Sequence, residues 1–212
     1  MIRLEHAEAY RLWAPEYDST PNPLLALEER VIGGMLRRAA SGLVLDVGCG
    51  TGRWERVLRP ARYFGVDMCP QMLRGTRCAA GDALTIPVAD AAAGLTICSF
   101  ILGYVQELDA ALKEWARVTR RGGTLAISDL HPDSGWSRSF RLGSEVYEIE
   151  HRVHAAQYVL DAASRAGLRL QHELAVPFGE AERPVFRAAG REDLLERVSG
   201  TPAVWAAVWV RP

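Results

Sequence analysis

Lysine is nearly absent from this chain: Lys113 is the single one, and arginine supplies the remaining basic side chains. The basic residues also fail to outnumber the acidic ones, since 25 Lys and Arg stand against 26 Asp and Glu and the formal net charge is -1. Proteins that bind polyanions through overall charge need a strong basic excess. The composition therefore predicts a small-molecule partner, and neither a nucleic acid nor a membrane.

Cysteine is scarce, and Cys49, Cys69, Cys78 and Cys98 contain no Cys-x-x-Cys pair. Disulfide frameworks and structural zinc sites require denser or more closely spaced cysteines. We therefore expect reduced, buried thiols and no metal site. A thiol site formed by three or four of these cysteines near the strand ends is a minor alternative.

Long apolar runs are missing as well. No stretch approaches the roughly 20 apolar residues that span a bilayer, and the first eight residues lack the apolar core of a signal peptide. These absences predict a cytoplasmic protein. The length of 212 residues, with 49% hydrophobic residues, fits one domain with a large core. Whether the chain is a monomer or a homodimer stays open, because the N-terminal helices can either pair between copies or cover the sheet.

Strand-like and helix-like segments alternate along the chain, which indicates an α/β fold with a parallel sheet. Helices are expected over residues 3–13, 24–40, 52–59, 70–75, 107–119, 154–166 and 191–198. Strands are expected over residues 43–47, 62–67, 77–80, 94–99, 123–129, 145–149, 168–176 and 203–210. The last strand is expected to insert antiparallel, and the polar, turn-rich segment 131–136 is expected to form a substrate loop.

A glycine-dense turn follows the first of the expected core strands. Gly48, Gly50 and Gly52 lack a Cβ, so they can adopt positive φ and bring backbone N–H groups close to a nucleotide-like ligand. Asp67 ends the next strand 19 residues after Gly48, the spacing at which a Rossmann-like fold presents a carboxylate to a ribose. A nicotinamide dehydrogenase would require Gly-x-Gly-x-x-Gly, but Arg53 occupies the last of those positions.

Five segments together resemble the class I S-adenosylmethionine (SAM)-dependent methyltransferases of the small-molecule type 11 group. They are residues 46–52, 65–73, 81–88, 99–104 and 121–125, and the N-terminal pair Tyr17-Asp18 is similar to the pair that this family carries on a lid over its cofactor. The resemblance implies a Rossmann-like, seven-stranded, mostly parallel sheet with helices on both faces, an antiparallel final strand and an N-terminal helical lid. It covers nearly the whole chain, as one methyltransferase domain over residues 1–212. Within it we expect the lid at 1–41, the SAM-binding core at 42–129, and the substrate loop with the C-terminal part of the sheet at 130–212.

The resemblance also implies a set of SAM-binding residues. These are Tyr17, Asp46, Gly48, Cys49, Gly50, Asp67, Met68, Met72, Asp82, Ala83, Leu84, Ser99, Phe100 and Tyr104. In this arrangement Asp67 accepts the ribose hydroxyls, Met68 and Leu84 enclose the adenine, and Asp82 accepts from the adenine amine. Asp46 is expected to accept from the turn amides or to face the ammonium group of SAM through water.

Simpler structural interpretations exist for several of these residues. Asp67 can cap the helix expected near residue 70, and Asp82 can fix a turn. Phe100 and Tyr104 can belong to the core, and Tyr17 can be a surface anchor.

The chemistry of methyl transfer requires little of the protein, because the SAM sulfonium is already a strong electrophile and the main task is to align an acceptor and exclude water. Where the acceptor carries a proton, a general base helps. His131 is the first candidate, since it follows a strand at the edge where open α/β sheets bind ligands, and Asp133 is the second.

An acceptor pocket of Trp13, Trp136, Tyr17 and Tyr104, with Arg138 or Arg141 available for a carboxylate or phenolate, is a further hypothesis. The acceptor atom (O, N or C) stays open. The alternative to methyl transfer is a SAM-binding protein without it, either a regulator or a SAM-assisted cyclase.

Overall fold

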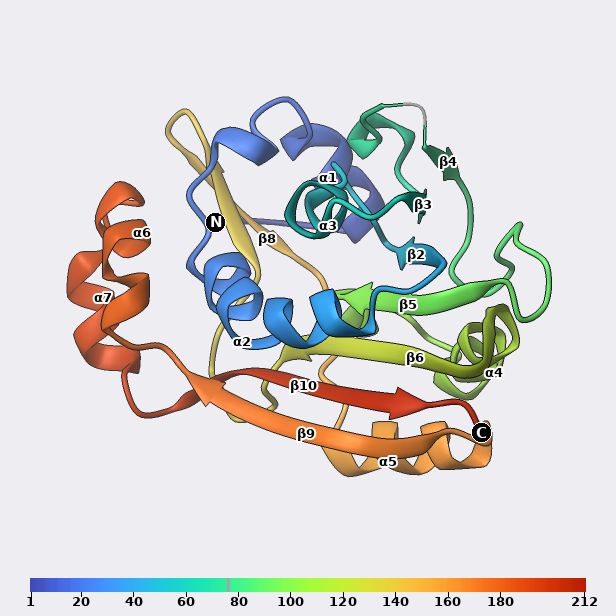
Figure 1. Cartoon of the computed structure of the whole chain (residues 1–212). Coiled ribbons are helices and arrows are strands. Elements are labelled where there is room, and N and C mark those ends of the chain that lie inside the picture. Colours follow the sequence, from blue (N-terminus) through green and yellow to red (C-terminus); the bar gives the residue numbers. More distant parts are fainter. Residues whose placement is uncertain (76) are drawn as a thin grey trace.

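A seven-stranded sheet in the order β4-β3-β2-β5-β6-β10-β9 forms the centre of the protein (Figure 1). The computed structural model describes residues 1–75 and 77–212. The strands are β2 (Leu43–Val47), β3 (Arg62–Asp67), β4 (Cys78–Ala80), β5 (Ala93–Ser99), β6 (Thr119–Leu130), β9 (Arg169–Pro177) and β10 (Pro202–Val210). Strand β10 runs antiparallel to both of its neighbours, β6 and β9, whereas the pairs between β4, β3, β2, β5 and β6 are parallel. The predicted fold class, including the antiparallel final strand, is confirmed.

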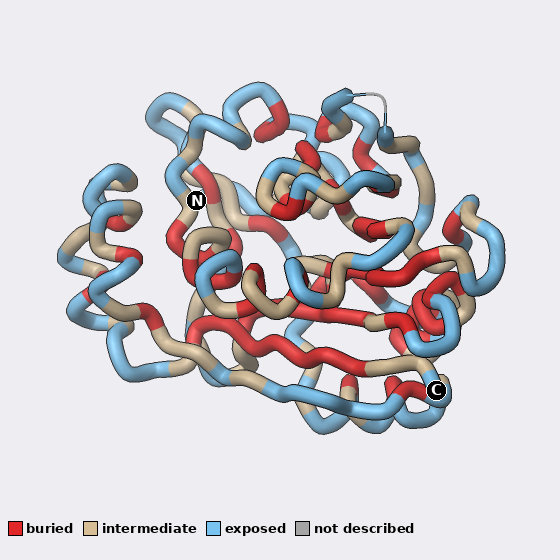
Figure 2. Tube along the Cα trace, in the orientation of Figure 1, coloured by how far each residue is buried: buried red, intermediate tan, exposed pale blue. Residues whose placement is uncertain are grey.

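Helices cover both faces of this sheet. They are α2 (Pro23–Ala39) and α3 (Arg53–Leu58) on one face, and α4 (Leu108–Val118) and α5 (Ala156–Arg165) on the other. Successive strand residues point to opposite faces, so Val44 packs with Trp54 of α3, whereas Leu45 packs with Trp115 of α4. The central strands are therefore buried on both sides, as their continuous apolar runs predict (Figure 2).

Helix α2 is capped at its N-terminus by the side chain of Asn22. The side chain of Asn22 accepts hydrogen bonds from the backbone N–H groups of Leu24 and Leu25 at 3.0 and 3.5 Å, and Pro23 occupies the first helical position. The helix then runs to Ala39, which confirms the expected helix over 24–40 within one residue at each end.

A second, three-stranded sheet in the order β1-β8-β7 joins the N-terminus to a hairpin far along the chain. Its strands are β1 (Ile2–Leu4), β7 (Ser139–Leu142) and β8 (Glu145–Ile149). The prediction of a helix from residue 3 is wrong at its start: α1 spans His6–Trp13, and the residues before it pair with β8 in parallel. Ring stacking of Trp13 on Phe140, with centroids 4.7 Å apart, fastens α1 to this hairpin.

Two other segments differ from expectation. The helix predicted over 70–75 is a single 3-10 turn, η2 (Pro70–Met72), because the chain is extended at Leu73 and takes φ +84° at Gly75. Helix α6 (Arg183–Ala188) was not predicted, whereas the next helix, α7 (Glu192–Val198), was. Phe186 and Leu195 of these two helices pack against Leu27 of α2. The remaining 3-10 turns are η1 (Tyr17–Ser19), η3 (Leu102–Tyr104) and η4 (Glu180–Glu182).

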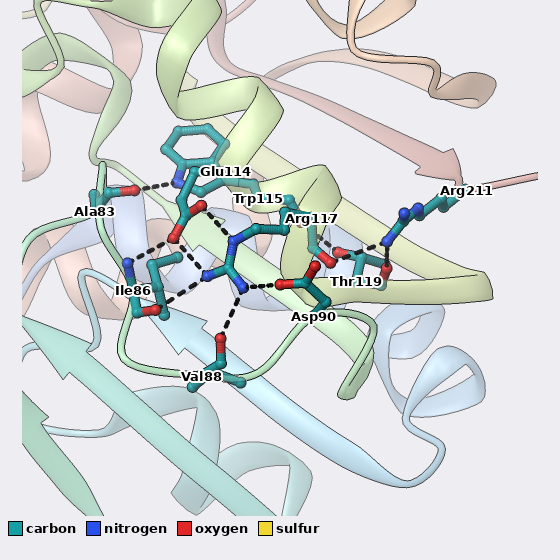
Figure 3. A network of polar contacts seen from close by, with 9 residues as sticks. All are labelled: Ala83, Ile86, Val88, Asp90, Glu114, Trp115, Arg117, Thr119 and Arg211. Atoms are coloured by element: carbon teal, nitrogen blue, oxygen red, sulfur yellow. Dashed lines mark hydrogen bonds and ion pairs between the residues drawn. The ribbon is translucent and has the colours of Figure 1, made fainter.

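Arg117, near the end of α4, holds the loop at residues 81–90 in place (Figure 3). Its guanidinium donates to the carbonyl oxygens of Ile86 and Val88 at 3.1 and 3.0 Å and pairs with the carboxylates of Asp90 and Glu114 at 2.5 and 2.7 Å. Trp115 Nε1 donates to the carbonyl oxygen of residue 83 at 3.0 Å. The position of this loop is thus set by side chains of α4.

All four cysteines are free thiols, and three of them are buried. Across residues 1–75 and 77–212, no three side chains of His, Cys, Asp or Glu gather as a metal ion would require. No helix in the same residues is both long and apolar enough to cross a bilayer.

Candidate functional site

A cavity of about 390 Å³ lies at the carboxyl ends of β2, β3 and β5, and residues of α1 and η1 also line it. This volume is typical of a small-molecule site, which generally measures about 300–1,000 Å³. The lining contains all the residues that the sequence suggested for SAM. They are Tyr17, Asp46, Gly48, Cys49, Gly50, Asp67, Met68, Met72, Asp82, Ala83, Leu84, Ser99, Phe100 and Tyr104.

The glycine turn is fixed by β3 beside it. The N–H groups of Gly48 and Cys49 donate to the carbonyl oxygen of Val66 at 2.7 and 3.0 Å. Gly48 has φ +72°, and a Cβ there would lie 2.1 Å from Cγ2 of Ile101, which lines the cavity. Only glycine satisfies both the backbone and the packing at this position.

Asp67 connects the end of β3 to the glycine turn. Its Oδ2 accepts from the N–H of Gly50 and its Oδ1 from the N–H of Cys69, both at 2.8 Å. Burial raises the pKa of Asp67, and the two amide bonds act in the opposite direction. Each carboxylate oxygen has a second lone pair, so the side chain can still accept hydroxyl groups from a ligand. Asp67 does not cap η2, because the N-cap residue of this turn is Cys69, whose side chain makes no capping hydrogen bond.

The hydrogen bonds of Asp46 differ from the expectation that its side chain accepts from the turn amides. Its Oδ2 accepts instead from the hydroxyl of Tyr63 at 2.8 Å, and its Oδ1 is buried with no partner among the described residues. The residue is 1% exposed, and this burial raises the pKa of Asp46 to about 7. One oxygen at the cavity wall is thus left without its hydrogen bond.

Residues 81–84, at the start of the loop 81–90, also line the cavity. Oδ1 of Asp82 accepts from the N–H of Leu84 at 2.9 Å, so Asp82 does fix a turn, as its simpler interpretation suggested. Asp82, Ala83 and Leu84 nevertheless all line the cavity. Met68 is 57% exposed, and its sulfur lies 3.3 Å from Nε2 of His6.

An arginine that the sequence analysis did not select also lines the cavity. Arg53 pairs with Glu28, which is 0% exposed on α2, and its Nη2 donates to Oγ of Ser99 at 3.0 Å. Glu28 accepts in addition from Ser99 at 2.7 Å and from Ser128. Nη1 of Arg53 is buried and has no partner among the described residues. Two features of the sequence could have indicated this ion pair. Glu28 is an acidic residue on the apolar face of the expected helix 24–40, and Arg53 is a cation directly after the glycine turn.

Aromatic side chains of the N-terminal segment cover the cavity. The ring of His6 stacks on Tyr104 with centroids 5.0 Å apart, and the hydroxyls of Tyr10 and Tyr104 lie 3.1 Å apart. Burial raises the pKa of Tyr17 to about 12, so its hydroxyl stays protonated at neutral pH. His6 and Tyr10 were not selected from the sequence, because they carry no motif.

Asp18 fastens this segment to the glycine turn. Its Oδ1 accepts from Oγ1 of Thr51 at 2.6 Å and from Nη2 of Arg56 at 3.1 Å. The pair Tyr17-Asp18 therefore has one side chain in the cavity wall and one in a polar contact with residues 51–56.

The residues suggested as general bases lie elsewhere. Neither His131 nor Asp133 lines the cavity, and Nδ1 of His131 accepts from the N–H of Asp133 at 3.2 Å. The chain turns away after β6 because Trp136 packs against Phe178 and Phe186, with centroids 5.2 and 6.2 Å away.

A second cavity of about 90 Å³ adjoins the first, and both are lined by Tyr10, Tyr17, Leu25 and Phe100. Five of the side chains suggested for an acceptor pocket line at least one of these cavities. Trp13, Tyr17, Trp136 and Arg138 line the second, and Tyr17 also lines the first. Tyr104 lines only the main cavity. Arg141 lines neither cavity, and its guanidinium donates to the carbonyl oxygen of Ser144 at 3.5 Å.

Comparisons with known proteins agree with this geometry. A family model described as a methyltransferase domain matches residues 45–127. A malonyl-[acyl-carrier protein] O-methyltransferase of Serratia marcescens is 33% identical over 178 residues, which cover 79% of this chain and 68% of the relative.

Solved structures share the fold. A SAM-dependent methyltransferase from Mesorhizobium loti superposes with a TM-score of 0.67 at 17% identity, over 90% of this chain and 100% of the other. The [4+2]-cyclase SpnF superposes with a TM-score of 0.68 at 17% identity, over 100% of this chain and 98% of the other. Together with the sequence relative and the family model, the cavity at the strand ends identifies the chain as a member of the SAM-dependent methyltransferases.

Proposed function

We propose that the main cavity holds SAM and that the chain transfers its methyl group to an oxygen of a small carboxylic acid. The observation that carries the cofactor assignment is the gathering of the glycine turn, Asp67 and the 82–84 loop around one cavity at the carboxyl ends of parallel strands. The oxygen acceptor is supported by the Serratia marcescens relative, which is named a malonyl-[acyl-carrier protein] O-methyltransferase.

Two orphaned polar atoms test whether the cavity fits SAM. The methionine part of SAM carries a carboxylate and an ammonium group. Among the residues that the structure describes, Nη1 of Arg53 is a buried donor without a partner and Oδ1 of Asp46 is a buried acceptor without one, and both residues line the cavity. Buried polar groups are rarely left unpaired, so a ligand of this chemistry would complete them. We therefore assign the carboxylate to Arg53 and the ammonium group to Asp46.

The other end of the cavity suits the adenosine. Asp67 would accept the ribose hydroxyls, and Asp82 the adenine amine. Met68 and Leu84 would enclose the adenine ring with apolar surface. Gly48 has no side chain, which would let a ligand approach the backbone of the turn.

The chemistry demands alignment and a dry site. Bound SAM supplies a methyl group on a positively charged sulfur. Tyr10, Tyr17 and Tyr104 cover the cavity and would exclude water from it. A carboxylate acceptor is already ionised at neutral pH, so no side chain has to remove a proton from it. The position of His131 and Asp133 outside the cavity is compatible with such an acceptor.

Residues 1–212 would act as one methyltransferase domain, in which the segments before residue 42 cover the cofactor and those after residue 129 complete the sheet and the acceptor side. Fold alone does not separate transfer from SAM binding without transfer, because a [4+2]-cyclase shares it. The mass of the product decides between these two functions.

The first experiment is calorimetric titration of the protein with SAM and with S-adenosylhomocysteine (SAH). Wild type should bind both, and Asp67→Asn should bind them roughly tenfold to a hundredfold less tightly, because a charge-assisted hydrogen bond contributes about 1.5–3 kcal/mol. Asp133→Asn, an exposed carboxyl outside the cavity, is the matched control and should bind as wild type does. Absence of binding by wild type would contradict the assignment.

A second step follows if SAM binds. We would incubate the wild-type protein with SAM and a panel of small acids, phenols and amines, and measure the masses of the products by mass spectrometry. A gain of one methyl group on the acids supports the proposal. A product with rearranged bonds and no added methyl group supports the cyclase alternative.

A further inference from the structure

The second cavity has a charge pattern of its own. Two cations, Arg138 and Arg191, line it together with aromatic and apolar side chains. Within residues 1–75 and 77–212, no Asp or Glu belongs to this lining. A pocket with cations and no anion favours a negatively charged ligand.

Arg138 is held rigidly and yet has a donor to spare. It is 8% exposed, it pairs with Asp129, and its Nη1 donates to the carbonyl oxygen of Phe100 at 2.5 Å. Its Nε is buried and has no partner in the described part of the chain. An unsatisfied buried donor of a charged group costs free energy, which a ligand acceptor would recover.

Arg191 lies at the exposed side of the same cavity. Its guanidinium sits over the ring of Trp136, 5.5 Å from the centroid, and it forms no ion pair with any residue that the structure describes. The ring positions the cation without neutralising its charge. Arg191 is thus available to an anion, in contrast to Arg183 and Arg187, which pair with neighbouring glutamates.

The volume limits what can enter. A cavity of about 90 Å³ has the volume of roughly three water molecules, whose share of the liquid is about 30 Å³ each. This is room for a carboxylate with a short stem. The four side chains that it shares with the main cavity place a carboxylate bound there next to the proposed cofactor.

We propose that the second cavity is the acceptor subsite and that Arg191 and Nε of Arg138 hold the carboxylate of a monocarboxylic acid there. This inference rests on the proposed function. One carboxylate oxygen pairs with the arginines, and the other forms a bond to the methyl carbon as the bond from that carbon to sulfur breaks, with the electron pair staying on sulfur. The sulfonium and carboxylate charges cancel, and no proton moves. The ester has no charge to pair with Arg191, which favours its release.

The test measures binding, with the protein saturated with SAH. Phenylacetate and hexanoate, and their neutral amides, are titrated into wild type, Arg191→Gln and Arg197→Gln. Arg197 is an exposed arginine on α7 outside both cavities, so its variant removes the same charge nearby. The acids should bind wild type at least tenfold more tightly than the amides. Arg191→Gln should reduce acid affinity about tenfold and leave the affinities for the amides and SAH unchanged.

Arg138 is tested as a pair, because Arg138→Gln alone leaves the buried Asp129 without its cation. Arg138→Gln combined with Asp129→Asn keeps the site neutral and should lose most of the preference for acids over amides. Equal binding of acids and amides by wild type, or an equal loss in Arg191→Gln and Arg197→Gln, would overturn the subsite. Failure of wild type to bind SAH contradicts the proposed function instead, so the two failures are distinguishable.

Discussion

Tyr63 donates its hydroxyl to Oδ2 of Asp46 at 2.8 Å, inside the core below the glycine turn. This bond offsets only part of the cost of burying a carboxylate, because Oδ1 has no partner among the described residues and burial holds the pKa of Asp46 near 7. The protein thus keeps a titratable group at the wall of its main cavity, where a ligand ammonium group would favour the ionised form.

Asp46→Asn should change how stability depends on pH. Between the unfolded pKa near 3.8 and the folded pKa near 7, the native wild type holds a proton that the unfolded chain has lost. The free energy of unfolding contributed by this group therefore falls as pH rises from about 4 to 7, and then levels off. Without ligand, the difference in unfolding free energy, variant minus wild type, should increase over that range by up to a few kcal/mol. Urea unfolding at pH 5, 6, 7 and 8 measures it.

Asp161→Asn, on the exposed face of α5, controls for the loss of a carboxyl group outside the core. Parallel pH profiles for wild type and Asp46→Asn would contradict the raised pKa of Asp46.

Glu28→Gln should be strongly destabilising. The change removes the charge that Arg53 faces at a position that is 0% exposed, and breaking a buried ion pair costs about 3–5 kcal/mol. Urea unfolding measures the loss. The double variant Glu28→Gln with Arg53→Met should be more stable than Glu28→Gln alone, since no unpaired cation is left buried. The single variant Arg53→Met is measured against wild type as well. If the double variant is less stable than Glu28→Gln by the same amount that Arg53→Met is less stable than wild type, the two side chains are not coupled.

Asp18→Ala should affect ligand exchange more than stability. Asp18 is about half exposed, so its contacts with Thr51 and Arg56 contribute less than about 1 kcal/mol to folding. They also join η1 to the glycine turn, and their loss should make SAH dissociate several-fold faster. Stopped-flow displacement measures this rate. Glu16→Ala, an exposed neighbour, should leave it unchanged, and equal rates in all three proteins would refute a fastening role for Asp18.

Trp115→Phe should loosen the loop at residues 81–90. The change leaves the carbonyl oxygen of Ala83 without the N–H that Trp115 donates, which costs about 1–3 kcal/mol. Unfolding free energy and SAM affinity should both fall, because Ala83 lines the cavity. Trp209→Phe, a buried tryptophan in the same core outside the cavity, is the control: it should lower stability without lowering SAM affinity. Unchanged SAM affinity in Trp115→Phe would contradict a role of this loop in SAM binding.

The sequence predicted those parts of the site whose causes are local. The glycine turn, the acid at Asp67 and the loop at residues 82–84 each lie at or just after the end of a strand, and parallel strands bring their carboxyl ends to one edge. The parallel sheet could be predicted for a similar reason, because short apolar runs alternate along the chain with amphipathic helices.

The rest depends on contacts between distant segments. Glu28 and Arg53 come from different helices, and nothing local in either sequence shows that they meet. His131 follows a strand, as a base at the sheet edge should, yet the packing of Trp136 directs the chain away from the cavity. The residues before His6 form a strand because β8 offers them an edge, and tertiary pairing outweighs helix propensity in so short a segment.

The pairing of β1 with β8 has a consequence for a nascent chain. Ile2 lies opposite Tyr147, and Arg3 donates to Glu148 at 3.1 Å across 145 positions of sequence. During synthesis the first residues leave the ribosome long before their partner strand exists, and a contact of such sequence separation forms late. We expect the central strands to assemble while the amino-terminal segment still waits for its partner. The newly made protein would then gain its covered cavity only after the hairpin at residues 139–149 has emerged.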